Sequence, residues 1–162
     1  MRFFVVPTRS MEPTLVPPEY LVTLQGEPYR RGDIVVIDDP VFPGEYLVKR
    51  LIALGGDEVS VRGGALFLNG SFASEPYLRE EIDYALEPYR VAEDEIFVLG
   101  DNRNESVDSH NWAVEESSPP RVAGVPKASI IGRVYGVYLP FDRIRKVSGF
   151  PLATVRQIRD GD

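Results

Sequence analysis

The chain of 162 residues contains no cysteine and only one histidine. The lack of cysteine excludes a disulfide framework and a thiol nucleophile. A single histidine argues against a zinc site built from several imidazoles and leaves little material for a Ser-His-Asp triad. If the chain is a hydrolase, we therefore expect its general base to be a side chain other than imidazole.

Long apolar runs and basic clusters are also missing. No stretch approaches the roughly 18 to 20 apolar residues that a membrane-spanning helix needs, and the apolar segment 1–7 is far too short. The net charge is −7, without a run rich in Lys or Arg. This charge pattern argues against a nucleic-acid partner.

Glycine and proline are plentiful instead, with 14 of each. They divide the chain into short segments and argue against a helical bundle. Gly63-Gly64 and Asn69-Gly70 are turn signals between apolar runs. The patterns predict a mostly β fold of antiparallel sheets that form a partly closed barrel. The expected strands span residues 2–6, 20–24, 33–37, 46–54, 58–62, 65–68, 95–99 and 128–139.

Helix signals are weak in this sequence. Residues 80–86 are expected to form a helical turn or two, and 115–123 an exposed loop. The tail 146–162 is poorly patterned, and 151–158 is either a terminal helix or a frayed end. The length favours one domain, 1–162, with enough chain for a real core.

Ser10 opens the run Ser-Met-Glu-Pro-Thr-Leu at 10–15. A serine hydroxyl is a poor nucleophile until a base takes its proton. Pro13 disfavours helix at the preceding residue, so we expect Ser10 on an irregular loop. On this run alone, an ordinary loop serine is the alternative.

Lys49 lies inside the apolar strand 46–54. A free lysine has a pKa of about 10.4, and burial lowers it by up to about 3 to 5 units. In a strand, Leu47, Lys49 and Leu51 share one face, which suits a buried amine. The alternative is a lysine that extends to solvent from a strand end. Arg50 points to the opposite face and needs an anionic partner.

The block Gly-Asp-Asn-Arg-Asn-Glu-Ser-Val-Asp-Ser at 100–109 follows a strand directly. Alone, it is equally typical of a tight turn rich in Asp and Asn. In order and spacing, the blocks at 10–15, 46–52 and 100–109 resemble bacterial type I signal peptidases over about residues 4–145. That family consists of membrane-bound serine proteases with a Ser–Lys dyad, two antiparallel sheets and a coiled barrel. The resemblance implies no metal or other cofactor.

The resemblance also implies roles for particular residues. Ser10 is the nucleophile and Lys49 the base, and the Ser10 N–H and Thr8 hydroxyl form the oxyanion hole. Ser106 orients the Lys49 amine. The supporting residues are Asp108, Asp101 and Arg50, and the candidates for substrate contact are Phe3, Val5 and Met11.

The implied substrates are secretory preproteins, cut after a small-x-small pattern such as Ala-x-Ala. The implied location is the extracytoplasmic face of the plasma membrane, in contact with the bilayer surface. The family carries an N-terminal membrane anchor, whereas Ser10 is the tenth residue here. We expect either a truncated, soluble or peripheral chain, or an unanchored form.

The main departure is His110, where the family often has arginine. The sequence Asp-Ser-His-Asn-Trp at 108–112 resembles that of the cyanobacterial and plastid members of the family more closely. We expect His110 to be a support residue, with a triad partner of Ser10 as the alternative. Residues 113–123 read as a loop insertion.

Three alternative functions can be weighed against the same residues. A self-cleaving Ser–Lys protease would need an internal cleavage site, and Ala123-Gly124 follows the catalytic blocks rather than preceding them. A catalytically inactive peptide-binding β-domain would have lost Ser10 or Lys49, and both are present. A conjugation-type processing peptidase is a closer alternative, which nothing in the chain favours.

Overall fold

The computed structural model describes residues 1–112 and 119–152, and its regular structure is mostly β-strand. The strands are β1 (Arg2–Val5), β2 (Tyr20–Leu24), β3 (Ile34–Asp38), β4 (Tyr46–Leu54), β5 (Glu58–Arg62), β6 (Ala65–Leu68), β7 (Ser71–Phe72), β8 (Leu86–Arg90), β9 (Glu95–Leu99), β10 (Val125–Pro126), β11 (Ile130–Leu139) and β12 (Arg145–Lys146). Short 3-10 turns are η1 (Arg103–Glu105), η2 (Lys127–Ser129) and η3 (Phe141–Arg143). In these described residues, no helix is long and apolar enough to cross a bilayer.

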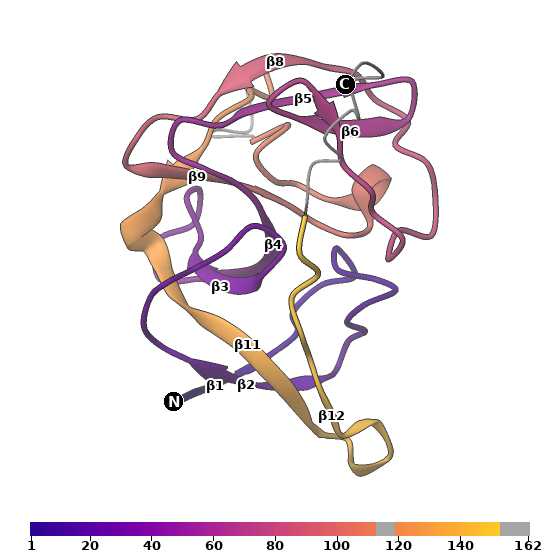
Figure 1. The fold of residues 1–162 in the computed structure, drawn as a ribbon. Helices are drawn as coiled ribbons and strands as arrows, with labels where there is room; N and C mark the ends of the chain where they lie inside the picture. Colours follow the sequence, from indigo (N-terminus) through magenta and orange to yellow (C-terminus); the bar gives the residue numbers. More distant parts are fainter. Residues whose placement is uncertain (113–118, 153–162) are drawn as a thin grey trace, which may run out of the picture.

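The larger sheet has eight strands in the order β1-β2-β11-β3-β4-β9-β10, with β12 paired to β11. All of its pairings are antiparallel. The sheet curls: β1 and β2 lie at one end of the molecule, β3 and β4 near its middle, and β11 runs from one region to the other (Figure 1). The expected mostly β, antiparallel, partly closed architecture is confirmed.

The smaller sheet has four strands in the order β7-β6-β5-β8. Its hairpin turns fall at the predicted positions. Gly63 and Gly64 have φ of 56° and 77°, and Asn69 and Gly70 have φ of 51° and 79°. Glycine and asparagine tolerate this left-handed backbone, which explains why those dipeptides mark the turns.

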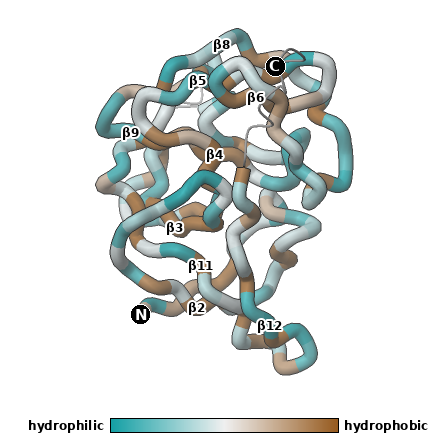
Figure 2. The backbone as a smooth tube through the Cα atoms, viewed as in Figure 1, coloured by the Kyte–Doolittle hydropathy of each residue, from teal (hydrophilic) through white to brown (hydrophobic). Residues whose placement is uncertain are grey.

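The core lies between and beneath the two sheets. Ile34 to Ile37 of β3 are all at most 1% exposed, because both faces of that strand are covered. Figure 2 shows the corresponding hydrophobic stretches along β3 and β4. In β5 and β6, alternate residues (Val59, Val61, Leu66 and Leu68) pack into a cluster with the ends of β4 and β9. Each such buried aliphatic side chain contributes about 1.5 to 3 kcal/mol.

Some local expectations were wrong. Residues 80–85 form no helix, and Leu86 instead begins β8, which pairs with β5. Within this segment the Ile82 N–H donates to the Gly64 carbonyl and the Asp83 N–H to the Asn104 side chain, and these bonds take the place of helical ones. The short strands β7, β10 and β12 were not predicted. The expected loop insertion at 113–123 lies partly outside the described residues. The expected terminal helix or frayed end at 151–158 lies largely outside them.

The segment after β12 returns along the molecule and packs against Gly32. The Phe150 N–H donates to the Gly32 carbonyl at 3.1 Å. Gly32 has φ +92°, and a Cβ at this position would lie only 1.6 Å from the Phe150 carbonyl oxygen. Glycine is therefore required here by both conformation and space.

We predict that Gly32→Ala strongly destabilises the protein. Gly44→Ala is the matched control, because Gly44 has φ +88° with nothing within 4 Å of the added Cβ. The control should lose about 1 kcal/mol of unfolding free energy from backbone strain. Gly32→Ala should lose at least about 2 kcal/mol more through overlap. Urea denaturation measures both, and equal losses would contradict the packing of the C-terminal segment on Gly32.

Candidate active site

Ser10 lies on a tight turn after β1. The Glu12 N–H donates to the Arg9 carbonyl at 3.1 Å, and the Leu15 N–H donates to the Met11 carbonyl at 3.0 Å. Met11 and Leu15 are 1% and 0% exposed and anchor the turn in the core. The irregular loop expected around Ser10 is therefore held firmly against the large sheet.

Lys49 approaches Ser10 from β4, where it pairs with Val35 of β3. The Lys49 side chain is buried, with the residue only 2% exposed. Its Nζ lies 2.9 Å from Ser10 Oγ and 3.1 Å from Ser106 Oγ. The structure thus brings one residue from each of the sequence blocks to a single point.

The surroundings of Lys49 favour a neutral amine. Burial lowers the pKa of Lys49 below its ordinary value, and the negative charges of Asp108, Asp39 and Asp101 oppose this more weakly. The hydrogen-bond partners of its Nζ are two hydroxyl groups. Hydroxyls satisfy a neutral amine and, unlike a contacting carboxylate, add no charge that would favour the protonated form.

The turn after β9 positions Ser106. A Cβ on Gly100 would lie 2.3 Å from Ser106 Oγ and 2.5 Å from the Ser10 carbonyl oxygen, so only glycine permits this approach. The Asn102 N–H donates to the Ser10 carbonyl at 2.9 Å. Asp108 Oδ2 accepts the Gly100 N–H at 2.9 Å. The third block, residues 100–109, therefore supports both the Ser10 loop and Lys49.

Thr8 lies next to Ser10. Its Oγ1 is 3.0 Å from Ser10 Oγ and 3.4 Å from Ser10 N. The hydroxyl of Thr8 and the N–H of Ser10 are thus close enough together to converge on one oxygen atom.

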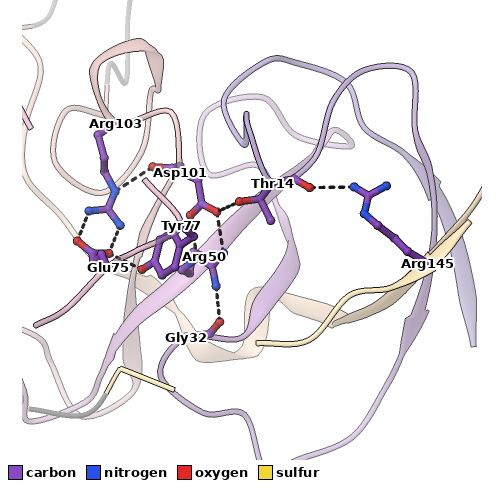
Figure 3. Close-up of polar contacts among 9 residues, drawn as sticks. Thr14, Gly32, Arg50, Glu75, Tyr77, Asp101, Arg103 and Arg145 are labelled. Atoms are coloured by element: carbon purple, nitrogen blue, oxygen red, sulfur yellow. Dashed lines mark hydrogen bonds and ion pairs between the residues drawn. The ribbon is translucent and has the colours of Figure 1, made fainter. Parts of the chain in front are cut away.

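Arg50 points away from Lys49, as the strand alternation predicts, into a buried ion pair. Its guanidinium donates to both Asp101 oxygens at 2.8 and 2.7 Å and to the Gly32 carbonyl at 2.8 Å. The Thr14 hydroxyl donates to the same Asp101 carboxylate at 2.5 Å. Figure 3 shows this chain of contacts, which joins β4, the Ser10 loop and the third block.

The sequence analysis missed a second buried pair beside the first. Arg103 donates to both carboxylate oxygens of Glu75 at 2.6 and 2.5 Å. The Tyr77 hydroxyl donates to Glu75, and the Arg50 guanidinium lies 3.8 Å from the centre of the Tyr77 ring (Figure 3). Burial raises the pKa of Tyr77 above its ordinary value, which keeps its hydroxyl protonated. Glu75 and Tyr77 lie in a segment without periodicity, so no sequence signal pointed to them.

His110 contacts Asp108 rather than Ser10. Its Nδ1 lies 2.5 Å from Asp108 Oδ1, and its ring stacks on Tyr84 with centroids 3.9 Å apart. Among the residues that the structure describes, no hydrogen bond joins His110 to Ser10. This geometry agrees with a support residue and not with a triad partner of Ser10.

The candidate substrate residues differ in exposure. Phe3 is 61% exposed, and Val5 is half-buried. Both line an apolar groove of about 390 Å³. Met11 is 1% exposed and packs in the hydrophobic core, so its side chain does not line this groove.

Comparison with known proteins identifies the family. The family model described as signal peptidase, peptidase S26, matches residues 1–139. The chain belongs to this family and is a serine peptidase. Similar proteins include the signal peptidase I of Leptolyngbya laminosa, 35% identical over 90% of this chain and 72% of the relative. The signal peptidase I of Bacillus licheniformis is 37% identical over 88% of this chain and 79% of its own length.

Relatives also occur in chloroplasts. Thylakoidal processing peptidase 1 of Arabidopsis thaliana is 33% identical over 86% of this chain, which spans 42% of that protein. Among solved structures, a signal peptidase I from Enterococcus faecalis superposes with a TM-score of 0.54 at 30% identity, covering 66% of this chain and 97% of that one. The family resemblance stated from the sequence motifs is therefore confirmed.

We predict that Asp101→Asn destabilises the protein severely. The substitution leaves the Arg50 charge, whose side chain is 2% exposed, buried without its anionic partner. Breaking such a pair costs about 3 to 5 kcal/mol. Glu58→Gln is the control, because the Arg90–Glu58 pair is exposed and 3.7 Å long. The control should change the unfolding free energy by less than about 0.5 kcal/mol. Similar values for both variants would show that Arg50 finds another partner or water.

Proposed function

We propose that this protein is an endopeptidase that removes N-terminal signal peptides from secretory preproteins through a Ser10–Lys49 dyad. The observation that carries the proposal is the 2.9 Å contact between Lys49 Nζ and Ser10 Oγ, made by a lysine that is 2% exposed. The relatives named signal peptidase I support the substrate class. The cut is expected after a small-x-small sequence such as Ala-x-Ala.

In the acylation step, neutral Lys49 accepts the Ser10 proton as Ser10 Oγ attacks the scissile carbonyl carbon. The Ser10 N–H, which donates to Thr8 Oγ1, and the Thr8 hydroxyl, which donates to Ser10 Oγ, redirect their hydrogen bonds to the developing oxyanion. Protonated Lys49 then gives its proton to the leaving amine, and the carbon–nitrogen bond breaks. An ester of the signal peptide remains on Ser10.

In the deacylation step, Lys49 takes a proton from water, which attacks the ester carbonyl. The proton passes to Ser10 Oγ as the acyl–oxygen bond breaks. Ser106 keeps the amine aimed at Ser10 through its 3.1 Å contact. Asp108 holds the turn that carries Ser106 through its bond to the Gly100 N–H. These steps use side chains and a backbone N–H of the chain itself, together with water.

The substrate is expected to approach along β1 and β4. Beyond Arg50, β4 pairs with β9, but residues 46–49 have no partner on that side within the described part of the chain. β1 is the outer strand of the large sheet. Extended peptides bind such edges by adding a strand, and here the added strand would reach Ser10.

We also propose that the site works at a bilayer surface, on the extracytoplasmic face of the plasma membrane. Several large apolar side chains are exposed, among them Phe3 at 61%, Phe141 at 83% and Ile144 at 59%. Exposed apolar groups of this size favour contact with lipid over water. Phe3 also lines the groove beside β1, which would place that entrance near the membrane.

We predict that Ser10→Ala and Lys49→Met each lower the cleavage rate of a preprotein with an Ala-x-Ala site by at least about 100-fold. Methionine fills the lysine site without an amine. Cleavage is followed by gel analysis in detergent or lipid, and circular dichroism checks the fold. His110→Gln is the control and should keep cleaving, because His110 contacts Asp108 and not Ser10.

The outcomes separate the competing assignments. If Lys49→Met still cleaves the preprotein and His110→Gln does not, His110 rather than Lys49 is the general base. No cleavage of any preprotein by the wild type would contradict the proposed function and favour a peptide-binding domain.

We predict that kcat/KM rises with pH as Lys49 loses its proton, along an acid limb that lies well below the pH expected for a free lysine. The shift follows from burial, which lowers the Lys49 pKa and is opposed first by Asp108. Removing that negative charge in Asp108→Asn should lower the pKa further and move the limb to lower pH. Asp142→Asn, at an exposed site, should leave the limb in place. A limb that moves to higher pH in Asp108→Asn would contradict Lys49 as the titrating base.

A further inference from the structure

Val5 directs its backbone N–H and its backbone carbonyl toward the outer edge of β1. The next residue, Val6, donates its N–H to Glu19, beside β2, at 2.8 Å. Successive residues of an antiparallel strand direct their N–H and C=O groups to opposite sides. Both polar groups of Val5 therefore point away from β2, toward the edge where a further strand would pair.

The Tyr46 hydroxyl occupies that position. It accepts the Val5 N–H at 3.2 Å and donates to the Val5 carbonyl at 2.8 Å. In an antiparallel sheet, a residue on the neighbouring strand makes the same exchange with its own C=O and N–H. One phenol thus satisfies both groups that a peptide backbone would otherwise satisfy.

Tyr46 stands where a bound peptide would run. It begins β4, three residues before Lys49, on the part of the strand that lacks a partner on the β9 side in the described structure. Its ring packs edge-on against Phe4 at 4.9 Å and lines the apolar groove with Phe3, Tyr20 and Tyr138. The hydroxyl consequently bridges the gap between the two edges on which the proposed function depends.

We propose that Tyr46 is a substrate mimic that lowers the affinity for peptide. In the free protein its hydroxyl closes the edge of β1, and an incoming substrate strand displaces it and takes over the Val5 bonds. The proposal rests on the proposed function. It also gives the edge a protection that exposed strand edges need, because an open row of N–H and C=O groups pairs readily with other chains.

A purely structural role for the hydroxyl has the opposite consequence. If Tyr46 served only to hold β1 against β4, its removal would loosen the binding edge and weaken peptide binding. If it competes with substrate, its removal frees Val5 and strengthens binding. The direction of the change therefore distinguishes the two roles.

The test compares the wild type with Tyr46→Phe in the cleavage of an Ala-x-Ala peptide. Phenylalanine keeps the ring contact with Phe4 and removes only the hydroxyl. We expect KM to fall about fivefold, as the loss of one competing hydrogen-bonded group implies, with kcat unchanged. Tyr135→Phe is the control: it removes the hydroxyl of an exposed tyrosine that does not line this groove, and KM should stay the same.

A second readout follows the Val5 amide by NMR hydrogen exchange in Ser10→Ala, a variant that we expect to bind peptide without cleaving it. The amide should exchange faster in Ser10→Ala/Tyr46→Phe than in Ser10→Ala. Addition of a signal peptide should restore its protection.

The outcomes separate this inference from the function on which it rests. If the wild type cleaves the peptide and Tyr46→Phe has an unchanged or higher KM, Tyr46 is not a substrate mimic, and the proposed peptidase function still stands. Failure of the peptide to protect the Val5 amide would lead to the same conclusion. An absence of signal-peptide cleavage by the wild type would overturn both.

Discussion

The burial of the Lys49 amine between two hydroxyl groups is the interaction on which the rest of the site depends. A lysine at a protein surface stays protonated at neutral pH and cannot accept a proton from serine. Here β3 and β4 carry the side chain inside the protein, where burial lowers its pKa. Ser10 and Ser106 satisfy its nitrogen without adding negative charge. Lys49 therefore combines a depressed pKa with a defined direction, both of which a proton acceptor needs.

Two buried ion pairs join the segments that carry Lys49 and Ser106. The Arg50–Asp101 and Arg103–Glu75 pairs each join a cation to a carboxylate, and the Tyr77 ring and hydroxyl connect them. Such pairs add little net stability, because both members lose their hydration. Their contribution is geometric, since each partner accepts only one arrangement of its neighbours. The network joins β4, the Ser10 loop, the turn after β9 and the segment after β7, and a displacement of any of these would move the site.

Much of the architecture was predictable because its signals are local. The glycine and asparagine turns, the alternation of β5 and β6 and the buried strands β3 and β4 all follow from residue type and period. The strand β8 was missed because its pairing with β5 overrides a sequence without clear alternation. β7, β10 and β12 span only two residues each, too short to carry a pattern. Glu75 and Tyr77 were missed for a related reason: their partners, Arg103 and Arg50, are distant in sequence, and nothing in the segment itself marks them.

By itself, the sequence determined the chemical groups and the family. It placed a serine on an irregular loop, a lysine within an apolar strand and a polar turn after a strand, and the order of these blocks identifies the signal peptidases. Tertiary structure alone decided that these groups meet, that the amine is buried, that His110 contacts Asp108 and that Tyr46 covers the edge of β1. The physical reason is that burial and hydrogen bonding depend on segments far apart in the chain. The 39 positions between Ser10 and Lys49 become a 2.9 Å contact only when the sheet curls.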